Sequence, residues 1–324
     1  MDAVITMPLN PRHFKKMGFY SIFAYAEYLS QLHKIPSVLV VNKRGIVDVD
    51  EMAQALAQRL QDFSLEPTAW WHDTSIDQAR VSDLIEQLLS RCVLEESQEK
   101  IVHCGCGKIQ YLSGATLRKT KTTLLSPDGM PLCCSKTIET TEVLALVTQK
   151  LKAPDVYPTL YPTWARKEFD WIYSELSGKR LLVSRVGAGG FLIRSPQGNS
   201  FWLDNDIVVS FLPWFLENHG IKGKHLVSGI STMRQVALMS MFMSSLGLQP
   251  FEEVHFLPRV NCKLEDFNSL LKDWGAVRLK NALLWCAVSG RQEISFDESL
   301  VTRMTPEIVM PQLDRLRHRK SLCR

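Results

Sequence analysis

Four of the eight cysteines lie in a spacing that suits metal binding. Cys104 and Cys106 form a C-x-C pair, and the adjacent Cys133 and Cys134 follow after 26 intervening residues. Four thiolates are the ligand set of a closed tetrahedral zinc site, which holds structure and does not catalyse. Because adjacent cysteines chelate awkwardly, His103 is an alternative ligand. An iron–sulfur cluster and four ordinary reduced cysteines are the other interpretations, and we expect structural zinc.

A second candidate site is the cationic stretch PRHFKKMG at residues 11–18, between an apolar segment and a helical pattern. Many nucleotide sites begin as strand, turn and helix, because the N-terminus of a helix attracts phosphate. Such turns are usually built from glycine or small residues, whereas this one carries Arg12, His13, Lys15 and Lys16. Two interpretations remain: solvated turn charges, or a new cationic pocket for a phosphate.

Alternating strand and helix patterns must position these residues. The β-branched run SVLVV at residues 37–41 is typical of a buried parallel strand, and helical periodicity precedes and follows it. We therefore predict an α/β fold with a Rossmann-like, doubly wound parallel sheet of five strands. We expect Thr74 or Ser75 to cap the helix that begins near residue 76.

Composition divides the chain into four segments. Residues 1–95 and 166–262 carry the α/β pattern and are predicted to be the two halves of one Rossmann-like domain. Residues 96–165 are rich in glycine, threonine, proline and cysteine, which predicts an inserted connective, zinc-binding module. Residues 263–324 are predicted to be helical, with a basic end. Within the second half, SPQGN predicts a hairpin and VALMSMFMSSLGL a buried helix.

The overall composition is that of an ordinary globular protein. The chain has 324 residues, of which 45% are hydrophobic and 22% charged, and its net charge of +4 permits an anionic partner without requiring one. The beginning of the chain lacks the charged and then apolar pattern of a signal peptide. We expect a soluble, cytoplasmic protein that binds neither DNA nor a membrane.

Six segments between about residues 4 and 305 resemble, in order, the catalytic region of class I aminoacyl-tRNA synthetases, and of methionyl-tRNA synthetases in particular. They include ITMPLNPRHFKKMGFYSIFAYAEYL, WWHDTSIDQARVSDLIEQLL, the cysteine-rich segment, LLVSRVGAGGFLIRSPQGNSFWLDNDIVVSFLPWF, HLVSGISTMRQVALMSMF and LKDWGAVRLKNALL. The resemblance implies the class I fold, with the cysteines in the zinc-bearing connective insertion. It does not extend to an anticodon-binding domain.

The resemblance also implies an amino-acid pocket, whose candidate residues are Trp202, Asp204, Arg185, Trp214 and Gly229. Core packing is the alternative for the two tryptophans. Asp204 follows an apolar strand, where a buried carboxylate needs a partner, and the α-ammonium group of an amino acid would be one.

The departures from the family concern the nucleotide. Of the HIGH signature only His13 remains, without the glycine, and HFLPRVNCKLEDF is too short for the KMSKS loop, leaving Arg259 and Lys263 as nearby cations. Ser231 stands where an aspartate of the family holds the ATP ribose. Preorganised charge around a transferring phosphoryl group is worth several kcal/mol. We therefore predict that ordinary adenylation is lost and regard ATP as a doubtful cofactor.

Three functions fit these residues. The first is transfer of an aminoacyl group from aminoacyl-tRNA to a small-molecule or peptide acceptor, as in the related cyclodipeptide synthases, with the lysines neutralising phosphates near the 3′ end. The second is an ATP-dependent amino-acid ligase with replacement phosphate ligands. The third is a non-catalytic protein that binds an amino acid or tRNA. The candidate catalytic residues are His13, Lys15, Lys16 and Ser231, and the further candidate nucleophiles are Thr232, Cys262 and Tyr28.

Overall fold

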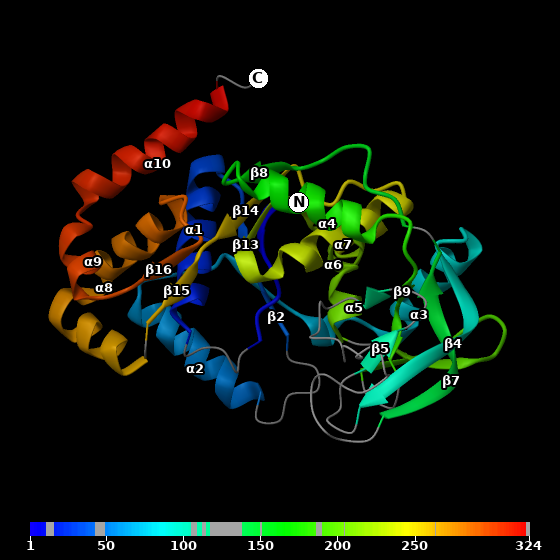
Figure 1. Ribbon diagram of the computed structural model, residues 1–324. Coiled ribbons are helices and arrows are strands. Elements are labelled where there is room, and N and C mark those ends of the chain that lie inside the picture. The colour runs from blue at the N-terminus through cyan, green and yellow to red at the C-terminus, as the bar shows by residue number, and fades with distance from the viewer. Residues whose placement is uncertain are drawn as a thin grey trace.

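A six-stranded parallel sheet forms the centre of the protein, in the order β3-β2-β1-β13-β14-β8 (Figure 1). The computed structural model describes residues 1–10, 16–42, 49–104, 109–111, 115–116, 138–149, 151–185, 190–203, 205–262 and 264–321. The strands of the main sheet are β1 (Asp2–Thr6), β2 (Ser37–Val41), β3 (Ala69–His72), β8 (Thr159–Tyr161), β13 (Lys222–Gly229) and β14 (Glu253–Leu257). The sequence-based prediction of an α/β fold with a parallel sheet is confirmed.

The sixth strand corrects the predicted number of five. The sequence of β8 is typical of a proline-rich connection, because its three residues lie between prolines at positions 158 and 162. It nevertheless pairs with β14, from Thr159 opposite Glu253 to Tyr161 opposite His255. Proline is tolerated beside such a short strand because β8 lies at the sheet edge, where one side needs no ladder hydrogen bonds.

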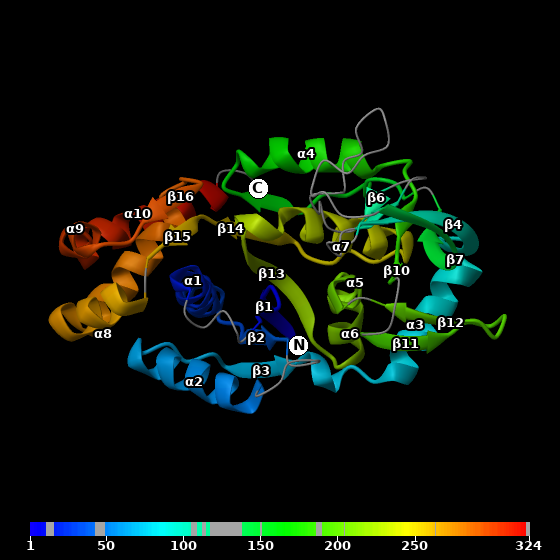
Figure 2. The same ribbon diagram turned by 60° about the horizontal axis from the view of Figure 1, so that its bottom comes forward.

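Helices cover both faces of the main sheet, as a doubly wound fold requires (Figure 2). The strands alternate between two cores: Ala3 and Ile5 face one, whereas Val4 faces the other. The first core is covered by α3 (Gln78–Ser90), α4 (Ala165–Leu176), α5 (Asn205–Val209), α6 (Leu212–Asn218) and α7 (Met233–Ser245). The second is covered by α1 (Met17–His33), α2 (Val49–Asp62), α8 (Leu264–Val288), α9 (Glu298–Arg303) and α10 (Pro306–Ser321).

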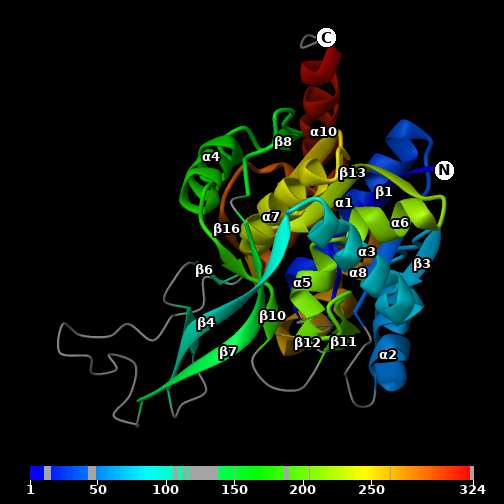
Figure 3. The same cartoon turned by 90° about the vertical axis from the view of Figure 1, so that its right-hand side faces the viewer.

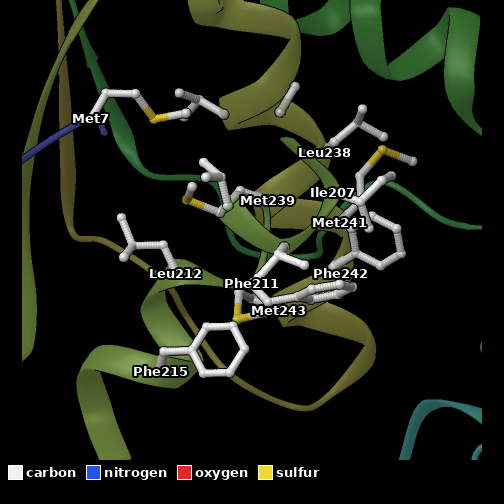
Figure 4. Close-up of a cluster of buried hydrophobic side chains, with 14 of the residues drawn as sticks. Met7, Ile207, Phe211, Leu212, Phe215, Leu238, Met239, Met241, Phe242 and Met243 are labelled. Atoms are coloured by element: carbon white, nitrogen blue, oxygen red, sulfur yellow. The ribbon is translucent and has the colours of Figure 1, made fainter. Parts of the chain in front are cut away.

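The methionine-rich helix α7 is buried, as its apolar sequence predicts. Met239, Met241, Phe242 and Met243 are fully enclosed and belong to one buried cluster with residues of α5 and α6 and with Met7 (Figure 4). Methionine fills irregular gaps in such cores because its side chain is unbranched and flexible. The sulfur atoms of α7 therefore belong to the packing of the first core.

A second sheet has the strand order β5-β4-β7-β9-β6 and includes Cys104 at the end of β4. β4 (Leu94–Cys104) and β7 (Ile138–Thr148) form a long antiparallel ribbon at the periphery of the molecule (Figure 3). The shorter members are β5 (Ile109–Tyr111), β6 (Ala115–Thr116) and β9 (Leu181–Leu182). Residues 96–165 thus supply most of this sheet and also β8 of the main sheet; the division into four segments stays a prediction.

Arg180, which directly precedes β9, forms ion pairs with two glutamates of β4. Its guanidinium contacts Glu95 at 2.6 Å and the buried Glu99 at 2.7 Å. Beside this pair, burial, together with the charge of Glu99, raises the pKa of the Tyr111 hydroxyl to about 12. The tyrosine therefore stays neutral at any ordinary pH, and the ion pair holds β4 against the segment that leads into β9.

The predicted hairpin is confirmed, whereas the predicted helix cap is not. β11 (Phe191–Arg194) and β12 (Ser200–Leu203) pair antiparallel across the SPQGN turn, in which Gly198 has a φ of +87°. β10 (Ser184–Arg185) extends this small sheet. Thr74 and Ser75 form a short 3₁₀ turn, and Asp77 caps α3 by accepting a hydrogen bond from the Ala79 amide. An aspartate at the N-cap makes the same bond that a serine or threonine would make.

The C-terminal part is helical, as predicted, with one short strand pair. β15 (Arg259–Asn261) pairs parallel with β16 (Glu293–Ser295), and α8 kinks at Gly275, whose φ is +75°. Arg59 on α2 donates a hydrogen bond to Asn268 of α8 at 2.8 Å, and Lys280 of α8 contacts Glu27 of α1 at 2.9 Å. Within the described residues, the helices are too short or too polar to cross a lipid bilayer.

Candidate functional site

A cleft of about 990 Å³ lies at the carboxyl ends of the central strands. β1 is followed by a helix on one face and pairs with β2, whereas β13 begins the second half of the sheet, so the strand order reverses between them. In open α/β sheets, ligands bind in the crevice at this switch point. The position of the cleft therefore agrees with the usual place of a functional site in this fold.

The chain segments that follow the strands build the walls. Asn10 follows β1, Asn42 follows β2, Gly229 ends β13, and Arg259 follows β14. Further walls come from α5 and from the segment after β16. The described residues that line the cleft are Met7, Pro8, Leu9, Asn10, Lys16, Gly18, Phe19, Ile22, Asn42, Asp206, Val209, Gly229, Ile230, Ser231, Thr232, Gln235, Pro258, Arg259, Val260, Asn261, Cys262, Ser295, Phe296 and Asp297.

Two helix N-termini open onto the cleft. The first turn of α1 reads Met-Gly-Phe-Tyr, and the N-cap residue is the exposed Lys16, whose side chain makes no capping hydrogen bond to the described residues. The first turn of α7 reads Met-Arg-Gln-Val, after the short 3₁₀ turn from Ile230 to Thr232. A lysine at a helix N-terminus is unfavourable for the isolated helix because both carry positive charge. An anion in the cleft would offset that repulsion.

Lys16 and Arg259 approach the cleft from neighbouring segments. The first turn of α1 lies against β15: a Cβ atom built on Gly18 would lie 3.8 Å from the Val260 amide nitrogen. Both cations are exposed, and among the described lining residues they are matched by the two carboxylates Asp206 and Asp297. Asp297 is committed to its own helix, because its Oδ1 accepts the Leu300 amide at 2.9 Å as the cap of α9.

Hydrogen bonds hold the polar wall between β13 and α7 in place. The Thr232 hydroxyl donates to the Gly229 carbonyl at 2.7 Å and contacts the buried Ser228 hydroxyl. Gln235 donates from Nε2 to the Asp206 carbonyl at 3.1 Å, which ties α7 to α5. Ser231 lies exposed between these fixed groups. The wall is therefore preorganised, and its serine hydroxyl is accessible to a ligand.

Asn42 offers an acceptor at the opposite wall. Its side chain lines the cleft, and its Oδ1 atom is buried without a hydrogen-bond partner among the described residues. A buried amide oxygen without a partner costs about 1–3 kcal/mol. A ligand N–H or O–H group would recover that cost.

The structure brings together some of the predicted site residues and separates others. Lys16, Ser231 and Gly229 line the cleft. Trp202 and Arg185 lie opposite each other on β12 and β10, in the small sheet, and are not among the described lining residues of the cleft. Half-buried Trp214, on α6, packs against the first core and likewise lies away from the described lining.

Several predicted positions lie outside the described residues: His13, Lys15, Asp204, Lys263, Cys106, Cys133 and Cys134. Of the four predicted zinc ligands, the structure places Cys104, which is buried at the end of β4 opposite Ile138. The zinc module therefore stays a prediction.

Sequence reasoning did not single out Asn10, Asn42, Asp206 and Gln235. Asn42 directly follows β2, and Asn10 lies four residues after the end of β1. The carboxyl ends of both strands meet at one edge of a parallel sheet, and this rule could have identified the two residues. Asp206 and Gln235 reach the cleft from helices α5 and α7, and no sequence spacing indicates that contact.

Comparison with protein-family models finds no match, and comparison with curated proteins finds none. Among solved structures, the chain is similar to the crystal structure of Mycobacterium tuberculosis methionyl-tRNA synthetase bound by methionyl-adenylate. The TM-score is 0.62 at 13% sequence identity, over 93% of this chain and 67% of that chain. The protein has a class I aminoacyl-tRNA synthetase-like fold. At this identity the likeness establishes the fold alone.

Proposed function

We propose that the cleft binds the aminoacyl-adenosine end of an aminoacyl-tRNA and transfers the aminoacyl group to a small-molecule or peptide acceptor. The observation that carries the proposal is the cleft itself, at the switch point of a synthetase-like sheet, with two helix N-termini and Lys16 at its rim. The structural neighbour was crystallised with methionyl-adenylate, an aminoacyl group joined to an adenosine nucleotide. The described walls suit a ligand of that kind.

The lining of the cleft divides into an apolar and a polar part. Met7, Ile22 and Val209 offer an apolar surface for an amino-acid side chain or an adenine ring. The hydroxyls of Ser231 and Thr232 and the amide of Asn42 offer hydrogen bonds to a ribose or an ester carbonyl. A few polar groups placed on a largely apolar wall are typical of small-ligand sites.

The transfer needs no nucleotide hydrolysis. An acceptor amine or hydroxyl attacks the ester carbonyl, the new amide or ester bond forms, and the ribose hydroxyl leaves with the proton of the acceptor. The ester is already activated, so the family's phosphate-binding signatures are dispensable. Two exposed cations, Lys16 and Arg259, balanced by two carboxylates, fit a phosphodiester backbone better than a triphosphate with its metal ion.

The second candidate is an ATP-dependent amino-acid ligase. The observation that favours it is the pair of helix N-termini beside Lys16 and Arg259, because this is a ready-made anion site. ATP would then be bound by replacement ligands in the same cleft. A non-catalytic binding protein is the third possibility and would use the same walls.

Equilibrium binding distinguishes the first candidate from the second. We expect charged tRNA to bind more tightly than the same tRNA without its amino acid, and ATP to leave the melting temperature unchanged. The control is Trp171→Phe, which changes an exposed aromatic residue of α4 outside the described lining. A rise in melting temperature with ATP, removed in Lys16→Ala, would support the ligase instead. Equal binding of charged and uncharged tRNA would remove the reason for assigning aminoacyl transfer.

A further inference from the structure

We propose that His225, Glu253 and His255 form a divalent-metal site on the α1 face of the main sheet. The proposal is independent of the function proposed for the cleft and of the predicted cysteine site. Two imidazoles and one carboxylate are a common ligand set for zinc, with a water molecule in the fourth position. We therefore take Zn²⁺ as the favoured ion and Co²⁺ as its spectroscopic substitute.

The parallel strands place the three side chains on one face. His225 on β13 and Glu253 on β14 are paired across the sheet, and His255 follows Glu253 by two residues. Because successive residues of a strand alternate between faces, both β14 residues point to the same side. Val227 and Leu257, at the same phase of their strands, belong to the core beneath α1. The cluster therefore faces α1.

The distances between the donor atoms fit one ion. Glu253 Oε2 lies 3.1 Å from His225 Nδ1 and 3.2 Å from His255 Nε2, and the three donor atoms lie within 4.8 Å of one another. Zinc bonds to nitrogen and oxygen are about 2.0–2.2 Å long, so ligand atoms at adjacent corners of a zinc tetrahedron lie roughly 3.3–3.6 Å apart. Both histidine–glutamate separations are close to that edge length.

Surrounding side chains orient the two imidazoles. The Tyr25 hydroxyl lies 3.3 Å from His255 Nδ1, and the Tyr161 ring stacks on His255 at a centroid distance of 4.9 Å. The His33 ring stacks on His225 at 4.3 Å. When His255 Nε2 ligates the ion, its Nδ1–H donates to the tyrosine oxygen. Metal-bound histidines usually donate their second ring N–H to such a partner.

Burial favours a paired or metal-bound state and still leaves a path for the ion. The side chains of His225 and His255 are 6% and 2% exposed to solvent, whereas that of Glu253 is 19% exposed. The ion and its water would enter from the glutamate side.

The proposed site is separate from the cleft. His225 lies four residues before the end of β13, which is about 13 Å at 3.3 Å per residue, whereas the cleft lies at the end of that strand. There the two imidazole ligands would contact α1, whose first turn lines the cleft, through Tyr25 and His33.

The test is a Co²⁺ titration of the metal-free, full-length protein. We expect a component of visible cobalt absorption that lacks the near-ultraviolet thiolate band, beside the thiolate component that the predicted cysteine site would add. Glu253→Gln keeps the shape of the side chain. In this variant, Co²⁺ should bind at least about 10-fold more weakly to the site whose spectrum lacks the thiolate band. His103→Gln is the matched control, because it removes a histidine beside Cys104 and leaves the cluster intact.

A second measurement does not depend on the Glu253→Gln variant and so guards against its misfolding. Zinc-edge X-ray absorption of the zinc-saturated protein should show imidazole scattering that persists in His103→Gln. A sulfur-only shell, or equal cobalt spectra and affinities for the wild type and Glu253→Gln, would overturn the proposal. The three side chains would then be a hydrogen-bonded histidine–glutamate–histidine network without an ion.

Discussion

Two glycines on the same strand separate the packing of the sheet from the ligand-binding role of the cleft. A Cβ atom at Gly223 would lie 2.7 Å from Cε1 of Phe251 and 2.8 Å from Cδ1 of Ile5. Both neighbours are buried, at 1% and 0% exposure, so neither can move without disturbing the core. A Cβ atom at Gly229 would lie 3.7 Å from Ser231 Oγ and 4.0 Å from Cδ1 of Ile22, which is ordinary contact.

Gly223→Ala should therefore destabilise the protein and Gly229→Ala should not. Overpacking a buried site costs about 1–3 kcal/mol. This corresponds to a fall in melting temperature of roughly 1–5 °C, at about 2.1 cal/mol/K of unfolding entropy per residue. Gly229 has a φ of −81°, which alanine adopts without strain. Its replacement should leave the melting temperature unchanged or raise it slightly, because alanine reduces the entropy of the unfolded chain.

For ligand binding, we expect Gly229→Ala to be the more damaging of the two substitutions. The methyl group of Gly229→Ala enters the cleft at the end of β13 and should crowd a bound aminoacyl-adenosine by about 1–3 kcal/mol, or roughly 5- to 150-fold in Kd. The assay is calorimetric titration with a non-hydrolysable 3′-aminoacylamino-adenosine, alongside thermal unfolding of both variants. Unchanged binding by Gly229→Ala would refute the contact between the ligand and β13. A stable Gly223→Ala would refute the packing of β13 between β1 and the segment before β14.

Three further predictions concern charge and burial. Lys16→Ala and Arg259→Ala should each reduce the salt dependence of tRNA binding, by about 0.7 in the slope of log K against log salt for every phosphate that the variant no longer neutralises. The hydrogen bond from Lys224, at 2.9 Å, lowers the pKa of the Asp2 carboxyl. Its contribution to stability is therefore present above the unfolded-state pKa of about 3.9 and disappears as the pH falls through the folded value. The melting temperature of Asp2→Asn should be lower than that of the wild type at pH 7. The two melting temperatures should converge at a pH below both the unfolded and the folded pKa of Asp2, and a difference that stays constant with pH would contradict the ion pair. Burial raises the pKa of the Cys286 thiol to about 12, so mass spectrometry should find it alkylated by iodoacetamide only after unfolding.

Local sequence patterns predict most of the elements because their signals are short-range. The β-branched run of β2, the apolar stretch of α7 and the SPQGN turn of the β11–β12 hairpin each form the structure that their own residues favour. β8 escapes such reasoning because its three residues between prolines carry no strand signal, and only its pairing with β14 makes it a strand. The N-cap of α3 is Asp77, whereas Thr74 or Ser75 was predicted. Aspartate, threonine and serine all fit an N-cap, so residue type alone cannot identify the one that is used.

The candidate site is only partly predictable. Lys16, Gly229 and Ser231 can be chosen because they lie next to strand ends or helix starts, and all three line the cleft. The contact between Gln235 and Asp206 depends on how α5 and α7 pack, which is a tertiary property. The same holds for the cluster of His225, Glu253 and His255, because cross-strand register brings its first two members together.

Aminoacyl transfer by the cleft can be measured directly as the release of a labelled aminoacyl group from charged tRNA, with hydroxylamine as a general acceptor and ATP–pyrophosphate exchange followed on the same sample. We predict that aminoacyl hydroxamate forms faster than without the protein and more slowly with Gly229→Ala, while amino-acid-dependent exchange stays at background. Hydroxamate formation at the uncatalysed rate would contradict aminoacyl transfer. Exchange above background would then assign the cleft to an ATP-dependent ligase, and its absence would leave a binding protein.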